Sequence, residues 1–192
     1  MNLACNPLPN YSLLNRNTLN FEVNAQFVIP VTQAEQIPAA INYAKEYDLT
    51  YQVLGGGSNV VLPKQLTGLT LLMDIDFIEL SKNDTSGVQL RVGAGVNWHQ
   101  LVSWTLEQGY LGLENLALIP GTVGAAPIQN IGAYGVEVEQ YICHVEAYDC
   151  LGQKWVKLSR ADCQFSYRHS LFKNHPKRFI ITAVVFDLPK SW

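Results

Sequence analysis

The chain has 192 residues, of which 48% are hydrophobic and 15% charged, a composition typical of a globular protein with an apolar core. Its 13 Lys and Arg and 16 Asp and Glu give a net charge of -3 and form no basic cluster, which argues against a nucleic-acid partner. No apolar run approaches the ~20 residues that a membrane-spanning helix needs. Residues 1–7 lack the charged and apolar regions of a signal peptide, so we expect a cytoplasmic protein with no membrane partner.

The first part of the chain, residues 1–75, is predicted to form one small subdomain with strand, helix and strand in that order. Residues 27–31 and 51–54 are short β-rich runs, and residues 69–74 form a third. We expect all three to be strands.

The helix between the first two strands is predicted from a capping signal and an apolar face. Thr32 and Glu35 have the spacing of a capping box, which marks a helix start. Apolar residues then recur at helical spacing, at Ile37, Ala40, Ile41 and Ala44. Pro38 lacks the N–H that a helix interior uses, so the helix either begins late or kinks there.

Residues 76–192 are predicted to form a second subdomain. Residues 77–80 and 88–92 are β-rich, and the polar run at residues 82–87 is typical of a turn between two strands. Asn97 can cap a helix that ends at Gly109. The apolar face of this helix would consist of Trp98, Leu101, Val102 and Leu106.

The last third of the chain is predicted to be mainly β. Residues 142–148 and 153–158 flank a glycine-containing turn and indicate a hairpin. Residues 159–162 suggest a short helix start, and residues 178–188 form the longest β-rich run. Short strands, few helices and long ordered loops together indicate the α+β class.

Cysteines and histidines show no spacing typical of a metal site or a redox pair. No C-x-x-C pair occurs among Cys5, Cys143, Cys150 and Cys163, which predicts reduced and mostly buried thiols. The histidines are equally scattered, at His99, His144, His169 and His175, so we expect no zinc site.

The strongest signal for a ligand site is the loop at residues 119–135. It is nearly uncharged, holds several glycines and prolines, and predicts no regular element. Glycine lets backbone approach a ligand closely, and successive N–H groups can bind an anion. Gln129 and Asn130 add amide donors and acceptors suited to a planar heterocycle. The alternative is a structural Ω-loop packed by its own side chains.

Two shorter segments add to this signal. The three glycines, serine and asparagine of residues 55–59 follow a strand and can bind a diphosphate through main-chain donors, although a plain β-turn explains them too. They match neither a Walker A loop nor a Rossmann fingerprint. Arg168, in the polar segment 166–170, is suited to bind a carboxylate, although a lone arginine is often a solvated charge.

Taken together and in this order, the segments resemble the UDP-N-acetylenolpyruvoylglucosamine reductase (MurB) family. The matching pieces are residues 54–59, 92–95, 97–99, 112–137, 163–168, Ser170 and 188–190. The resemblance extends from about Asn17 to Trp192, and the 119–135 loop is its most specific part.

The resemblance implies an α+β, two-subdomain FAD-binding module of the PCMH/MurB type, with subdomains at residues 1–75 and 76–192. FAD is then held non-covalently, with both glycine-rich loops contacting the same dinucleotide. The residues assigned to cofactor binding are Gly55, Gly56, Gly57, Ser58, Asn59, Ile119, Pro120, Gly121, Gly124, Ala125, Ala126, Ile128, Gln129, Asn130, Gly132, Ala133, Tyr134 and Gly135.

The resemblance also implies a reaction. NADPH reduces the flavin, and the flavin then reduces a small-molecule UDP-sugar, UDP-N-acetylglucosamine enolpyruvate, to UDP-N-acetylmuramate for peptidoglycan synthesis. Arg168 matches the catalytic arginine that stabilises the enolate-like intermediate of the enolpyruvyl group.

The sequence departs from the family pattern in three places. Residues 17–20 differ from the family's usual Asn-Thr-Phe-Gly, and Ala125 with Ala126 replaces serines found in some members. Family enzymes continue into a third, substrate-binding domain that provides the proton-donating serine. Since these 192 residues do not include it, we expect the chain alone to be inactive or weakly active.

Two alternatives to a reductase remain. The first is a non-catalytic or degenerate FAD-binding protein of the same fold. The second is a member of the related FAD-oxidase group. Many such oxidases attach FAD covalently through a histidine near the diphosphate loop, and residues 55–59 contain none.

Overall fold

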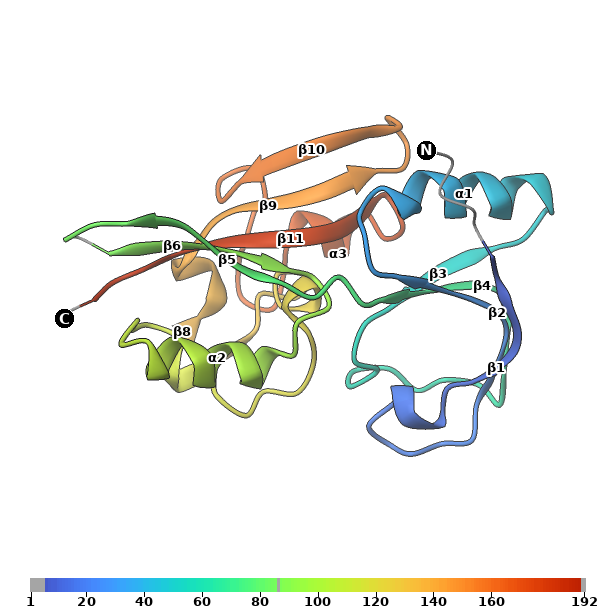
Figure 1. Cartoon of the computed structure of the whole chain (residues 1–192), viewed down its shortest axis with the longest axis horizontal. Coiled ribbons are helices and arrows are strands. Elements are labelled where there is room, and N and C mark those ends of the chain that lie inside the picture. Colours follow the sequence, from blue (N-terminus) through green and yellow to red (C-terminus); the bar gives the residue numbers. More distant parts are fainter. Residues whose placement is uncertain (1–5, 86, 191–192) are drawn as a thin grey trace. The chain divides into compact units, whose positions relative to one another are not determined.

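The computed structural model describes residues 6–85 and 87–190, which fall into two units, Met1–Ile75 and Asp76–Trp192 (Figure 1). Both units contain helices and strands, so the α+β class is confirmed. Cys5 and most of the N-terminal stretch used to argue against a signal peptide lie outside the described residues, as does Ser86 of the predicted 82–87 turn.

The first unit is built on a four-stranded sheet. Its elements are β1 (Leu8–Ser12), η1 (Leu14–Arg16), β2 (Asn24–Val31), α1 (Gln36–Glu46), β3 (Tyr51–Leu54) and β4 (Gln65–Met73). The strand order is β1-β2-β4-β3, with β2 and β3 parallel to β4 and β1 antiparallel to β2. The three predicted strands are confirmed. The edge strand β1 was not predicted, because its residues are mostly exposed and show no alternation of apolar and polar types.

Helix α1 begins later than the capping signal suggests. Its first residue is Gln36, and the carboxylate of Glu35 caps nothing; the side-chain oxygen of Gln36 instead accepts from the backbone N–H groups of Thr32 (2.8 Å) and Gln33 (2.9 Å). Pro38 therefore lies in the first turn, where its missing N–H breaks no intrahelical bond. The predicted apolar face of Ile37, Ala40, Ile41 and Ala44 is confirmed as buried.

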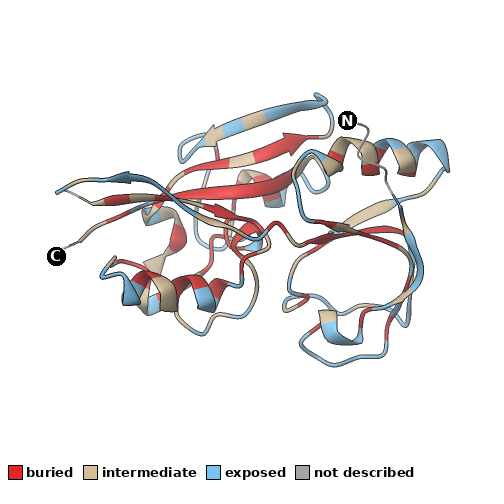
Figure 2. Ribbon diagram, viewed as in Figure 1, coloured by how far each residue is buried: buried red, intermediate tan, exposed pale blue. Residues whose placement is uncertain are grey.

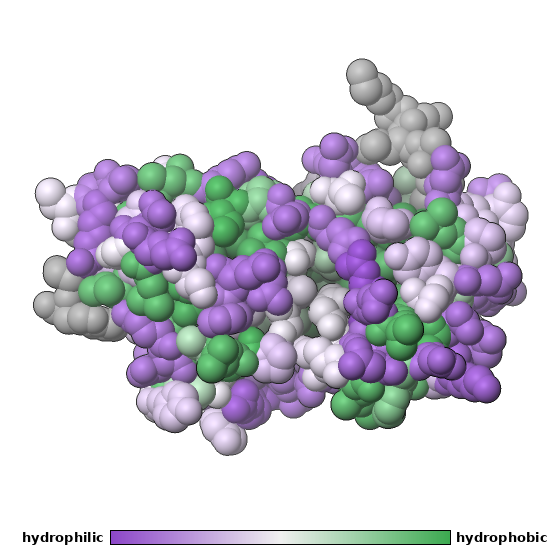
Figure 3. Space-filling model, turned by 60° about the horizontal axis from the view of Figure 1, so that its bottom comes forward, coloured by the Kyte–Doolittle hydropathy of each residue, from purple (hydrophilic) through white to green (hydrophobic). Residues whose placement is uncertain are grey.

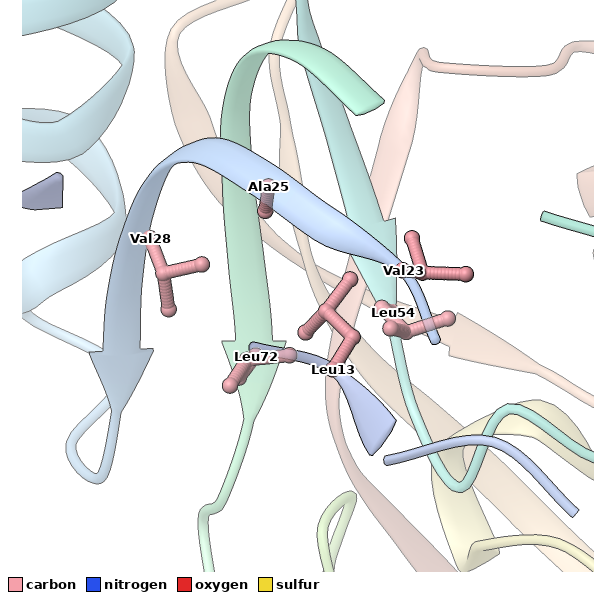
Figure 4. Packing of buried hydrophobic residues seen from close by; sticks show 6 residues of the cluster. All are labelled: Leu13, Val23, Ala25, Val28, Leu54 and Leu72. Carbon is pink, nitrogen blue, oxygen red and sulfur yellow. The ribbon is translucent and has the colours of Figure 1, made fainter. Parts of the chain in front are cut away.

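Buried apolar side chains of this unit pack into one cluster (Figure 4). It joins strands β2, β3 and β4 with the segments that lead into and out of η1, through Leu13, Val23, Ala25, Val28, Leu54 and Leu72. Because Leu54 is the last residue of β3, this packing also fixes the starting point of the 55–59 loop.

The second unit is built on a five-stranded antiparallel sheet of order β10-β9-β11-β6-β5. Its longer elements are β5 (Ile78–Asn83), β6 (Val88–Gly93), α2 (Trp98–Glu107), β9 (Ile142–Asp149), β10 (Lys154–Ser159), α3 (Leu171–Asn174) and β11 (Phe179–Leu188). Short elements between α2 and β9 are η2 (Glu114–Leu116), η3 (Val123–Ala125), β7 (Gly132–Ala133), β8 (Val136–Glu137) and η4 (Val138–Gln140). The predicted hairpin and the long final strand are confirmed, and β11 is buried along most of its length (Figure 2).

Helix α2 begins and ends where its sequence predicts. The side chain of Asn97 accepts from the N–H of Gln100 (3.0 Å), and Gly109 ends the helix with φ of +73°. Trp98, Leu101 and Val102 are buried as expected. Leu106 was wrongly placed on the buried face, since it is 44% exposed; Thr105 is buried instead and donates its hydroxyl to Val102 O (2.8 Å).

The helix start predicted at residues 159–162 is wrong. A turn follows the end of β10 here, and the carboxylate of Asp162 accepts from both the N–H (2.9 Å) and the hydroxyl (2.6 Å) of Ser159. The last helix begins later, after Ser170, whose side chain accepts from Lys173 N.

The two faces of the five-stranded sheet differ in chemistry. On one face, the indole of Trp98 packs 6.1 Å from the ring of Phe186, between ring centroids. Arg91, Val185 and His144 are cross-strand partners, and Val185 precedes Phe186 on β11, so these three lie on the opposite face. Here Arg91 pairs with Glu146 (2.8 Å), and the face is charged.

His144 is a buried titratable group on this charged face. Its side chain is only 10% exposed, and its Nε2 has no hydrogen-bond partner among the described residues; the nearest carboxylate oxygen, on Glu146, is 3.6 Å away. Burial lowers the pKa of His144, and the charge of Lys157 lowers it further.

Asp149 holds the turn of the β9–β10 hairpin. Its carboxylate accepts from the N–H groups of Leu151 (3.1 Å) and Gly152 (3.2 Å) and from the guanidinium of Arg178 (3.1 Å). The side chain is 4% exposed, and the Arg178 hydrogen bond lowers its pKa.

The cysteines in the described part of the chain form no disulfide. Cys163 is buried, and burial raises its pKa to about 12, whereas Cys143 and Cys150 are half-buried. The expectation of buried thiols therefore holds for one of these three.

The surface is mixed. On the face shown in Figure 3, apolar side chains form separate small groups among polar ones. Within residues 6–85 and 87–190, no helix combines the length and the apolar character that crossing a bilayer requires.

We predict that Asp149→Ala lowers the free energy of unfolding by about 2 kcal/mol, because it removes a buried carboxylate and leaves two backbone N–H groups and a guanidinium without their acceptor. Urea unfolding measures the change. Asp76→Ala, at an exposed aspartate, is the matched control and should change little. Equal losses in both variants would contradict the role of Asp149.

We also predict that His144 makes stability depend on pH. Its pKa in the folded chain lies below the 6.5 of the free side chain, so the unfolded chain takes up the proton first and stability falls as the pH drops through 6.5. His144→Gln should flatten this loss in urea unfolding between about pH 7.5 and pH 5. A loss of stability that is as steep in His144→Gln as in wild type would contradict this role of His144.

Candidate functional site

In the first unit, the 55–59 loop begins directly after β3 and rests on another backbone segment. Gly57 has φ of +61°, and a Cβ built on it would lie 2.1 Å from the carbonyl oxygen of Arg16. The N–H of Thr18 donates to Gly57 O (3.3 Å). Only glycine permits both this conformation and this contact.

The supporting segment is itself held firmly. Asn17 is 7% exposed, and its side chain donates to Leu13 O (2.8 Å) and accepts from Phe21 N (2.9 Å). Arg16 forms a two-fold pair with Asp74, at 2.8 and 3.0 Å. The loop that the sequence assigns to a diphosphate therefore has a rigid base.

The loop also offers unused main-chain donors. Within the part of the chain that the structure describes, the N–H groups of Gly56, Gly57 and Asn59 donate to no acceptor. Neighbouring free N–H groups are a suitable site for an anion, because they bind it without a formal charge on the protein. This arrangement fits a diphosphate.

In the second unit, the 119–135 loop lies against the end of β6. Gly124 N donates to Ala94 O (2.9 Å), and a Cβ at Gly124 would be 2.5 Å from the Cβ of Ala94. Val123 N donates to Val96 O (2.9 Å), and Trp98 N donates to Gly121 O (3.0 Å). The segment around Ala94 thus also supports the loop.

Burial separates the loop residues into two groups. Gly124, Ala126 and Asn130 are buried. Pro120, Ala125, Ile128, Tyr134 and Gly135 are exposed, and Ile128 and Tyr134 are large apolar or aromatic side chains with 42% and 88% exposure. Exposed apolar groups are suited to pack against a planar ring system.

Free donors accompany this exposed group. The N–H groups of Gly121, Thr122 and Gln129 donate to no acceptor in residues 6–85 and 87–190. A heterocycle with carbonyl and ring-nitrogen acceptors can use such groups, so this loop fits a flavin ring as the sequence suggests.

Arg168 lies at the tip of a tight turn that packs beside the loop. Ser166 and His169 exchange backbone hydrogen bonds of 3.2 and 2.9 Å across this turn, which we call the Arg168 turn (residues 166–169). Arg168 has φ of +53°, is exposed, and donates from its guanidinium to Gly132 O (3.0 Å). The structure therefore brings together two of the three predicted segments, and the 55–59 loop belongs to the other unit.

Two features of the site were missed by reasoning from sequence. The side chain of Asn130 is occupied by protein partners instead of being open to a ring, and Ser170 donates its hydroxyl to Ile128 O (2.6 Å). The only sequence signal for either contact is the presence of short polar side chains within an apolar loop and after a turn.

A profile described as "FAD binding domain" matches residues 25–156 of the chain. The UDP-N-acetylenolpyruvoylglucosamine reductase of Polynucleobacter asymbioticus (strain DSM 18221 / CIP 109841 / QLW-P1DMWA-1) is 52% identical over 183 residues, which are 95% of this chain and 53% of that protein. The chain thus spans about half the length of the curated relatives it matches.

Solved structures agree with this similarity. The UDP-N-acetylenolpyruvylglucosamine reductase (MurB) of Thermus caldophilus superposes with a TM-score of 0.71 at 27% identity, covering 96% of this chain and 62% of that one. A solvent-stable cholesterol oxidase superposes at 0.62 with 14% identity, covering 97% and 37%, which shows a shared fold. The expected PCMH/MurB-type fold and the resemblance to MurB are confirmed.

We predict that Gly57→Ala lowers the free energy of unfolding by more than about 2 kcal/mol, because the added Cβ meets the Arg16 carbonyl in addition to the cost of positive φ. Gly109→Ala is the matched control. It also has positive φ, but a Cβ there meets nothing within 4 Å, so about 1 kcal/mol is expected. Equal losses in urea unfolding would contradict the close contact at Gly57.

Proposed function

Since the chain belongs to the family of FAD binding domains, we propose that it binds FAD non-covalently as part of an NADPH-dependent reductase. The proposed reaction reduces UDP-N-acetylglucosamine enolpyruvate to UDP-N-acetylmuramate, in the cytoplasm, for peptidoglycan synthesis. The name of the Polynucleobacter relative supports this substrate class. The observation on which the proposal rests is the Arg168 turn, hydrogen-bonded to Gly132 of the 119–135 loop.

The residues for the cofactor follow from exposure and free donors. FAD, when bound, accepts a hydride from NADPH and donates one to the substrate. We assign its diphosphate to the N–H groups of the 55–59 loop and its ring system to the exposed side chains and free N–H groups of the 119–135 loop. The absence of a histidine from residues 55–59 favours non-covalent binding over the covalent attachment of many oxidases.

Arg168 is proposed to bind the substrate carboxylate and to stabilise negative charge as the enolpyruvyl group is reduced. One of its N–H groups donates to Gly132 O, and a guanidinium has several more. The remaining donors can form two parallel bonds to a carboxylate while the first bond keeps the side chain beside the loop.

The decisive experiment is a titration of the purified chain with FAD, followed by its visible absorption spectrum. Flavin absorption bands that accompany the native chain, together with release of the flavin on acid denaturation, support the proposal. A chain that binds no FAD contradicts it, and flavin that stays with the denatured chain indicates a covalent oxidase instead. Bound FAD whose spectrum never responds to the UDP-sugar, even in a chain as long as the relatives, supports a non-catalytic protein.

We predict that Arg168→Lys, in a chain as long as the relatives, slows reduction of the enolpyruvyl substrate at least about tenfold and leaves flavin reduction by NADPH within about twofold. Lysine keeps the charge and loses the planar pair of donors. Stopped-flow absorbance separates the two half-reactions. Arg160→Lys, at another partly exposed arginine of the same unit, is the control. If both half-reactions fall equally, Arg168 does not have this role.

A further inference from the structure

Asn130 is the most completely buried polar side chain of the 119–135 loop. It has 0% exposure in a chain without ligand, so its side chain does not face the space that a cofactor would occupy. Its Nδ2 donates to Glu137 Oε2 (2.9 Å) and to Ser166 O (3.2 Å), and its Oδ1 accepts from Glu139 N (3.1 Å). Both amide hydrogens and the oxygen are therefore used by protein groups.

The backbone at this position also favours asparagine. Asn130 has φ of +46°, in the left-handed region that asparagine and glycine adopt more readily than other residues. Glycine meets the backbone requirement but has no amide. Aspartate has the same shape but no donor, and it would face the carboxylate of Glu137.

The contacts of Asn130 connect elements that are distant in sequence. Glu137 is the last residue of β8, Glu139 belongs to η4, and Ser166 begins the Arg168 turn. Two further bonds join residues 166–170 to the 119–135 loop. They run from Ser170 Oγ to Ile128 O (2.6 Å) and from Arg168 to Gly132 O (3.0 Å). Of these three bonds, only the one from Asn130 starts from a fully buried side chain of the loop itself.

We propose that Asn130 is a positioning residue, which fixes the Arg168 turn against the 119–135 loop through its bond to Ser166 O. This inference rests on the proposed function, because it gives Asn130 a part in the presentation of Arg168 to the substrate. An exposed arginine on a free turn samples many directions, and a turn fixed at its first residue reduces that freedom before the substrate arrives. The role assigned to Asn130 from sequence, contact with the ring, is replaced by this one.

A pair of variants isolates the bond to Ser166. Asn130→Gly keeps the left-handed backbone and removes every side-chain contact. The double variant Asn130→Asp with Glu137→Gln reverses the donor and acceptor between positions 130 and 137, so that contact is restored, and the acceptor for Glu139 N is kept. Of the three contacts of the Asn130 side chain it lacks only the one to Ser166 O, where it places a carboxylate oxygen against the carbonyl. Asn10→Gly, at an exposed asparagine with φ of +51°, is the matched control.

Hydrogen exchange of the 192-residue chain, with and without FAD, tests the proposal. In wild type, FAD should slow exchange of the Ser166 and His169 amides, which bridge the turn. In both Asn130 variants these amides should exchange about tenfold faster without FAD, and FAD should no longer slow them. The amides of β9 and β10 in these variants, and all amides of the Asn10→Gly chain, should keep wild-type rates. Loss of this coupling at constant exchange elsewhere distinguishes positioning from general destabilisation.

The other outcomes are equally informative. Turn amides that keep wild-type rates in the double variant, or rates that rise equally throughout the second unit, overturn the positioning role. A wild-type chain that binds no FAD overturns the proposed function, and the rates measured without FAD then decide the role of Asn130 alone. If Asn130→Gly does not fold, the double variant, which keeps two of the three contacts, gives the answer.

Discussion

An irregular loop inside a folded unit must find hydrogen-bond partners for its own backbone, and this requirement determines the candidate site. Residues 119–135 have little regular structure, so strand pairing satisfies few of their polar groups. Their backbone uses the end of β6, where Gly124 N donates to Ala94 O, and the side chain of Ser170, which donates to Ile128 O. The close approach at Gly124 is available only without a side chain. Among the described residues, the N–H groups of Gly121, Thr122 and Gln129 in this loop donate to no acceptor, and a ligand can bind there.

The sequence predicts those parts of the fold in which a single local signal coincides with burial. Helix α2 has a capping asparagine, an apolar face and a terminal glycine, and all three agree with the structure at Asn97, Trp98 and Gly109. Prediction failed where two signals competed. At Ser159 and Asp162 the same side-chain contact can begin a helix or close a turn, and the turn was formed. Strand β1 is exposed at the edge of its sheet and shows no apolar pattern to detect.

The site was predictable at the level of segments and less so at the level of side chains. The high glycine content identified both loops, because segments of backbone that approach each other closely require glycine. The role of the Asn130 amide has no such sequence signal, because an asparagine in a glycine-rich loop is equally consistent with ligand contact and with a buried hydrogen bond. Only the partners, Ser166 and Glu139, separate the two, and they lie 36 and 9 positions further along the chain.

Exposure in the chain without ligand separates residues that can contact a ligand from residues that support others. In a chain without its ligand, a residue that touches the ligand must be accessible, and a residue with no accessible surface must act through another. Ile128 and Tyr134 are accessible and can contact a ligand directly, whereas Asn130 has no accessible surface. Arg168 lies between them, since it is exposed yet its direction depends on Gly132 and on the turn that Asn130 holds. Its suitability for a carboxylate is therefore a property of the loop as much as of the arginine, and a substitution that leaves Arg168 intact can still remove it.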